Sequence, residues 1–248
     1  MIIERLKSSV ITVGHGRGFV VEGAGERLVI TAAHCLPSLP LALPSFGLEA
    51  RTYGPLLARR GEEPRAWAVC RFVDPIADIA VLGSPDNPHA DDYQALMGTA
   101  TALSFGDAVR RPVNFWAPAR LLSLDGRWFS CTIRHFGGPL WITHAAERVH
   151  GGMAGSPIVA EAGTAIGVVC ATTSPREGGP NARLSHNLPG WLLRETSRWP
   201  ARRCFRGSMA GLHAPLSTLH ETVSRPPAHD SEPMWNKCVF WKIRPYWD

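Results

Sequence analysis

The stretch RLVITAAHC, residues 27–35, decides how the rest of the chain is interpreted. Its first half is a short run rich in β-branched residues, which predicts a strand. His34 follows directly after this strand, next to Cys35. A lone histidine is commonly structural, so the meaning of His34 depends on what the remaining sequence supplies.

The remaining sequence is patterned mostly as short β-strands. Many closely spaced strands favour a barrel or sandwich over alternating β-α units. Helix-period stretches are scarce before LPGWLLRETSRW (188–199), and we expect the last strand to end near Thr173, before one helix. The predicted strands are SSVITV (8–13), GFVVE (18–22), RLVITAA (27–33), AWAVCRFV (66–73), DIAVLG (78–83), RWFSCTIRHF (127–136), PLWITHA (139–145), SPIVAE (156–161) and AIGVVCATT (165–173).

Composition excludes several classes of protein. The 248 residues are 45% apolar and 19% charged, which suits a globular chain with a sizeable core. No apolar run reaches the length of a membrane span. The net charge is +5 and the pI about 9.1, but the basic residues are dispersed and carry no nucleic-acid-binding signature. We therefore expect a solvated basic surface, with no nucleic acid or membrane partner.

The six cysteines and the N-terminus bear on the compartment. The cysteines are scattered without close pairs, so neither a CxxC metal site nor a dense disulfide framework is predicted, and we expect no cofactor. The N-terminal residues include Glu4, Arg5 and Lys7 before any apolar stretch. This is unlike a secretory signal. We expect mostly reduced cysteines in a cytoplasmic protein.

Two more segments resemble parts of a catalytic site. In DPIADIAVL (74–82), Asp78 precedes an apolar strand; in GGMAGSPI (151–158), glycines frame Ala154. Asp78 alone can cap a turn, and the glycines alone can mark a tight turn. Together with His34, they favour a histidine, an aspartate and a nucleophile loop, in that chain order.

In this order, GRGFVV, TAAHC, DIAVL, GMAGSPI and GVVCA make roughly residues 8–195 resemble the chymotrypsin-like (trypsin-fold) serine peptidases. The resemblance implies an all-β fold of two packed, six-stranded antiparallel barrels. Residues 1–105 would form the barrel carrying His34 and Asp78, and residues 106–187 the barrel carrying the Gly152–Gly155 loop. A helix and an extension rich in Trp, Arg and Pro would occupy residues 188–248. An α/β-hydrolase is rejected, because its Gly-x-Ser-x-Gly turn is absent and its histidine comes last.

The resemblance also implies roles for individual residues. His34 would be the general base, Asp78 would orient it, and backbone N–H groups of Gly152 and Ala154 would form the oxyanion hole. The family's serine falls on Ala154, which has no hydroxyl, and Ser156 should point elsewhere. Either an engineered change or a natural pseudopeptidase explains Ala154, and we favour engineering. The native protein would be a serine endopeptidase acting on protein substrates; the alternative is a peptide-binding module.

Departures from secreted relatives suggest an intracellular bacterial peptidase. Met153 stands where digestive relatives have an aspartate that pairs with a cleaved N-terminus, so no such activation is expected. The cysteine that bridges to Cys35 in secreted relatives is absent, which predicts a free thiol.

Family spacing gives a further expectation about the substrate. It places Arg148, Cys170, Ala171 and Thr172 around the substrate pocket; Arg148 would favour an acidic side chain, although a surface arginine is the better interpretation.

A separate expectation about partners comes from the extension, which lies beyond the resemblance. It contains a predicted linker, SRPPAHDSEP (224–233), and is rich in tryptophan on both sides of it. These aromatics either join the core or bind an activating protein partner. They are Trp199, Trp235, Trp241 and Trp247.

Overall fold

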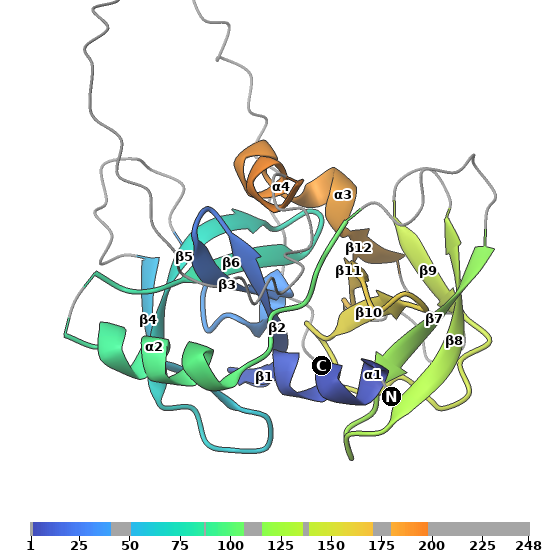
Figure 1. Cartoon of the computed structure of the whole chain (residues 1–248), viewed down its shortest axis with the longest axis horizontal. Coiled ribbons are helices and arrows are strands. Elements are labelled where there is room, and N and C mark those ends of the chain that lie inside the picture. Colours follow the sequence, from blue (N-terminus) through green and yellow to red (C-terminus); the bar gives the residue numbers. More distant parts are fainter. Residues whose placement is uncertain are drawn as a thin grey trace, which may run out of the picture. The chain divides into compact units, whose positions relative to one another are not determined.

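The computed structural model describes residues 2–40, 51–86, 88–106, 116–135, 139–170 and 180–197. The chain divides into two compact units, Met1–Arg203 and Cys204–Asp248, and all described elements belong to the first. This first unit is built on two closed antiparallel barrels of six strands each (Figure 1). The predicted all-β double barrel is thereby confirmed.

The first barrel has the strand order β1-β2-β3-β6-β5-β4 and closes where β1 pairs with β4. Its side chains form one apolar core, in which Phe19, Ile30 and Leu82 are completely buried. The strands are β1 Val10–Val13, β2 Gly16–Gly23, β3 Glu26–Thr31, β4 Thr52–Arg59, β5 Ala66–Asp74 and β6 Ile79–Gly83.

The second barrel has the order β10-β11-β12-β9-β8-β7 and closes where β10 pairs with β7. It has a smaller core of its own, which includes Leu121, Ile158 and Met153. The strands are β7 Trp116–Leu122, β8 Trp128–His135, β9 Leu140–Thr143, β10 Pro157–Ala160, β11 Ala165–Val168 and β12 Pro180–Arg183.

A helix and an extended segment connect the barrels. Helix α2, Ala90–Thr99, packs on β4 and β5 through Tyr93 and Met97, both of which are buried. The following segment bonds to both barrels, because the Leu103 N–H donates to Val20 O (2.8 Å) and the Ala165 N–H donates to Ser104 O (2.9 Å). The predicted boundary at residue 105 lies in this segment and stays a prediction, as does the one at residue 187.

Short helices lie at both ends of the described chain. Ile2–Arg5 (α1) and Leu6–Ser9 (η1) precede β1, and Ala33–Cys35 (η2) follows β3. After β12 come α3, Leu184–Asn187, and α4, Gly190–Ser197. Helix α4 packs on β2, where Leu192 is completely buried. The predicted tryptophan-rich extension lies outside the described residues.

The predicted end of the strands near Thr173 is wrong, because β12 follows at Pro180–Arg183. Two other strands, β4 and β7, were also not predicted, and all three contain a proline. Pro55 falls within the register shift between Tyr53 and Leu57, and Pro180 is the first residue of its strand. These are positions where the missing N–H of proline is tolerated.

Candidate active site

The β3–β6 pairing brings His34 and Asp78 together. Thr31 of β3 is paired with Ala80 of β6 in an antiparallel ladder. The chain leaves β3 just before His34 and enters β6 just after Asp78, so both residues lie at the same end of the ladder. Asp78 has a φ of 54°, which is uncommon for a residue other than glycine and is typical of constrained functional positions.

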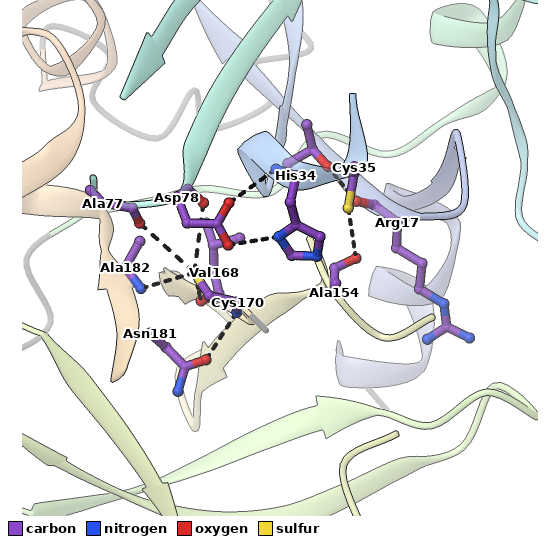
Figure 2. A network of polar contacts seen from close by, with 11 residues as sticks. Arg17, His34, Cys35, Ala77, Asp78, Ala154, Val168, Cys170, Asn181 and Ala182 are labelled. Atoms are coloured by element: carbon purple, nitrogen blue, oxygen red, sulfur yellow. Dashed lines mark hydrogen bonds and ion pairs between the residues drawn. The ribbon is translucent and has the colours of Figure 1, made fainter. Parts of the chain in front are cut away.

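Asp78 binds His34 through both carboxylate oxygens (Figure 2). The distance from His34 Nδ1 to Asp78 Oδ2 is 2.7 Å, and the His34 backbone N–H donates to Asp78 Oδ1 at 3.0 Å. Since a carboxylate accepts, the proton lies on Nδ1 in the neutral ring, and Nε2 is left with a free lone pair. The His34 side chain is 43% exposed, so this second nitrogen is accessible for proton transfer.

The carboxylate of Asp78 also changes the acidity of His34. The hydrogen bond from the ring to Asp78 raises the pKa of His34 above its usual value of 6.5. Partial burial opposes this increase, while the charge of Asp78 adds to it. The imidazolium form of His34 is therefore favoured relative to that of a free histidine.

The loop that contains Ala154 is built from two successive turns. The Met153 N–H donates to His150 O (3.2 Å), and the Ser156 N–H donates to Met153 O (3.0 Å). Gly152 and Gly155 have φ values of +79° and +82°, in the left-handed region that favours glycine. The Gly152 and Ala154 N–H groups donate to no group among the described residues, so both are free to bind a ligand.

Gly155 also allows a close approach between the barrels. A Cβ atom on Gly155 would lie 1.8 Å from Arg17 O, which is far inside van der Waals contact. At the same point the Arg17 N–H donates to Ala154 O at 2.8 Å. The loop of the second barrel is thus attached directly to β2 of the first.

His34 and Ala154 line one cavity of about 340 Å³. In the view of Figure 2 the His34 ring lies between Asp78 and Ala154. The cavity is lined by His15, Gly16, His34, Cys35, Val149, His150, Gly151, Gly152, Ala154, Val169 and Cys170. The residues that line it therefore include an imidazole base, two residues whose backbone N–H groups have no partner in the described part of the chain, and the alanine at position 154.

The remaining predicted site residues have different positions. Cys170 lines the cavity, and its thiol lies 3.6 Å from Asp78 O. Arg148 is exposed and is not among the described residues that line the cavity, and its role in a substrate pocket stays a prediction. Ala171 and Thr172 lie outside the described residues. Ser156 is completely buried and does not line the cavity either.

Cys35 is a free thiol, as predicted. Its Sγ lies 3.7 Å from Ala154 O, and burial raises the pKa of the thiol. Within the described ranges, no three His, Cys, Asp or Glu side chains are placed to hold a metal ion. In the same part of the chain, no helix is long and apolar enough to cross a membrane.

Three residues near the site were missed by the sequence analysis. His15, in the turn between β1 and β2, and His150, before the Ala154 loop, both line the cavity. Arg17 contacts the loop from β2. A lone histidine or arginine in a turn or strand carries no sequence signal for such a position. Arg17 does stand inside GRGFVV, but only as an unremarked residue of a strand motif.

Comparisons with known proteins agree with this arrangement. A family model for the trypsin-like peptidase domain matches residues 16–168, which include His34, Asp78 and Ala154. A search of curated proteins gave no significant match.

Two solved structures were compared with the chain. One is Rv3671c from M. tuberculosis H37Rv, a serine-to-alanine mutant in its inactive form (18% identity, TM-score 0.48, covering 80% of this chain and 92% of that one). The other is the Rv3671c protease in its inactive form (17% identity, TM-score 0.46, covering 79% and 91%).

Proposed function

The chain belongs to the trypsin-like peptidase family, and we propose that with a serine at position 154 it is an endopeptidase that cleaves protein substrates. The observation that carries this proposal is the 2.7 Å contact between His34 Nδ1 and Asp78 Oδ2, made beside a cavity that Ala154 also lines. This is the base-and-orienter arrangement that activates a hydroxyl nucleophile.

Each group has a defined task in the proposed reaction. As the serine oxygen attacks the peptide carbonyl carbon, Nε2 of His34 takes the hydroxyl proton and then delivers it to the leaving amine. Asp78 holds the required tautomer and stabilises the imidazolium. The free N–H groups of Gly152 and Ala154 bind the negative oxygen that develops on the substrate carbonyl. Water then hydrolyses the acyl-enzyme with the same base.

With alanine at position 154 we propose that the chain binds peptides without cleaving them. The alanine methyl group has no hydroxyl that His34 could deprotonate, so no acyl-enzyme forms, whereas the cavity and its donors remain. Ser156 does not replace the nucleophile, because its side chain is completely buried. The peptide-binding chain and the peptidase thus differ by one oxygen atom.

We also propose that the loop needs no N-terminal cleavage to form. Met153 is 1% exposed and belongs to the apolar core of the second barrel, and its Sδ accepts the His150 N–H at 3.4 Å. An apolar anchor thus holds the loop without an ion pair to a chain terminus. Extending the N-terminus should leave the activity of the Ala154→Ser protein unchanged.

The test of the proposed function is Ala154→Ser, alone and combined with His34→Ala. A fluorophosphonate probe should label Ala154→Ser within residues 151–158, and the label should disappear with His34→Ala. Ser156→Ala, added to Ala154→Ser, is the matched control and should leave labelling unchanged. If Ala154→Ser neither reacts nor cleaves a broad peptide library while the cavity still binds peptides, the protein is a natural pseudopeptidase.

A further inference from the structure

Arg17 is a buried cation that has no acidic partner among the described residues. It is only 6% exposed, although it lies in β2 beside the candidate active site. Burial, together with the nearby charge of Arg60, lowers the pKa of its guanidinium to about 10. Burying a charge is costly unless hydrogen bonds compensate for it. The hydrogen bonds of the Arg17 guanidinium must therefore offset this cost.

The guanidinium of Arg17 reaches across to the second barrel. Its Nη1 donates to Leu122 O at 2.8 Å, and its Nη2 donates to Ser123 O at 3.1 Å and Leu124 O at 3.2 Å. These three carbonyls belong to the end of β7 and the turn that leads to β8. One side chain of the first barrel therefore holds three consecutive peptide groups of the second.

The backbone of the same residue holds the Ala154 loop. The Arg17 N–H donates to Ala154 O at 2.8 Å. Arg17 O accepts the Thr31 hydroxyl at 2.6 Å and lies against Gly155. Arg17 is thus fixed to its own barrel on one side and contacts both the nucleophile loop and the β7–β8 turn on the other.

The β7–β8 turn also lies next to the Gly152 turn, which carries one of the proposed oxyanion donors. A Cβ on Gly152 would lie 3.6 Å from Leu124 Cδ2, so the Leu124 side chain lies next to the Gly152 turn. Leu124 is 51% exposed and has little packing of its own to fix it. The hydrogen bond from Arg17 to Leu124 O is therefore an important constraint on where this side chain lies.

We propose that Arg17 is a positioning residue, which sets the Gly152 and Ala154 N–H groups in place by holding the nucleophile loop and the β7–β8 turn together. The proposal rests on the proposed peptidase function, because the donors matter only if they bind a developing oxyanion. Arg17 touches no reacting atom and acts through its neighbours. Loss of its side chain should lower the rate of the chemical step more than the affinity for peptide.

The first test needs no catalytic activity. In the chain with Ala154, Arg17→Met keeps a long unbranched stem and removes all three side-chain hydrogen bonds. Arg27→Met is the matched control, because the Arg27 guanidinium also bonds backbone carbonyls, those of Met97 and Ala100, far along the chain from the loop. Hydrogen exchange should accelerate about 10-fold or more across residues 121–127 and 150–156 in Arg17→Met only. Equal protection of these segments in the two variants would overturn the proposal.

The second test adds kinetics in the Ala154→Ser protein. Arg17→Met should lower kcat about 10- to 100-fold and change KM less than about 3-fold, whereas Arg27→Met should change neither. Arg17→Lys keeps the charge but not the fork of donors, so it should recover only part of kcat. If Arg17→Met does not fold, Arg17→Lys and Leu124→Ala decide the matter; unchanged kcat in both would overturn the proposal. If Ala154→Ser is itself inactive, the proposed function fails, and the exchange experiment still tests the role of Arg17.

Discussion

The two halves of the candidate active site are held in place by different means. His34 and Asp78 lie on one barrel, at the end of a continuous β3–β6 ladder, and contact each other directly. The Ala154 loop lies on the other barrel, where turns shape it and contacts from Arg17 attach it to β2. The base half is therefore a property of one sheet. The nucleophile half depends on the interface between the barrels, which makes it the half that a change outside the loop can disturb.

The largest effect is expected when the contact between Asp78 and His34 is disrupted. In the Ala154→Ser protein, Asp78→Asn should lower kcat about 10⁴-fold, the magnitude seen for triad aspartates, because an amide favours the wrong tautomer of His34. The β3–β6 ladder does not depend on this charge, so the melting temperature should change little. Steady-state kinetics and thermal unfolding measure the two quantities. A loss of kcat below about 10-fold would show that Asp78 does not orient His34.

The next largest effect is expected when the contact between the Ala154 loop and β2 is disrupted. Gly155→Ala forces a methyl group onto Arg17 O in addition to its φ of +82°, and should destabilise the protein by about 3 kcal/mol or more. Gly25→Ala is the control, with a φ of +79° but no atom within 4 Å of the added methyl group. It should cost about 1 kcal/mol. Equal losses in urea unfolding would mean that the close contact between the barrels is unimportant.

A smaller effect concerns pH and sharpens the description of the base half. The hydrogen bond to Asp78 raises the pKa of His34 above 6.5, so the neutral base forms only as the pH rises through this raised value. The rate of Ala154→Ser should therefore increase with pH, with a midpoint above 6.5. In the folded chain with Ala154, NMR titration of the imidazole should give the same midpoint, and Asp78→Asn should move it downward. If Asp78→Asn left the midpoint unchanged, the hydrogen bond to Asp78 would not be the cause of the raised pKa of His34.

The contribution of His34 to stability depends on pH in the opposite direction to the rate: it decreases as the pH rises. Since the folded-state pKa of His34 is raised, its contribution to stability is complete below pH 6.5 and is lost as the pH rises through the folded value. Because the side chain is 43% exposed, solvent screening keeps this contribution small. Urea unfolding of the Ala154 chain and its His34→Gln variant at pH 5 and pH 9 measures it. Greater stabilisation by His34 at pH 9 than at pH 5 would be inconsistent with the raised pKa.

The smallest effect compares how readily the two barrels open. Cys70 in the first barrel and Cys131 in the second are both buried free thiols, with pKa values raised by burial to about 11 and about 12. Neither should react with iodoacetamide at neutral pH unless its barrel opens. We expect Cys131 to react a few times faster when Arg17→Met loosens the interface, while Cys70 is unaffected. Mass spectrometry of the two cysteine peptides measures both rates.

Sequence alone predicted the parts of this molecule that short-range patterns determine. The β-branched runs gave nine of the twelve strands of the barrels, and the missing ones (β4, β7 and β12) each contain a proline, which argues against a strand. Helix α2 was missed because it buries only Tyr93 and Met97, which is too narrow an apolar face to stand out.

The residues of the candidate site likewise fall into those that a local sequence pattern predicts and those that it does not. His34, Asp78 and the Ala154 loop stand in recognisable segments, so they were predicted. Arg17 donates hydrogen bonds to carbonyls more than 100 residues away in the sequence. His15 and His150 are far apart in the sequence and line the same cavity only in the folded chain. Such contacts exist only after two barrels have packed, and no local pattern encodes them.

Gly16 marks a position where the candidate site could be cross-linked covalently. A Cβ on Gly16 would lie 3.6 Å from the Cβ of Cys35, within the range of natural disulfides. The backbone therefore has the spacing of a disulfide bridge at this point, with glycine in place of the second cysteine. A Gly16→Cys substitution would supply a second thiol, although the new side chain must displace the Ala154 carbonyl, which lies 2.9 Å from its Cβ. Such a bridge would join β2 covalently to the segment that carries His34, directly beside the Ala154 carbonyl of the candidate site.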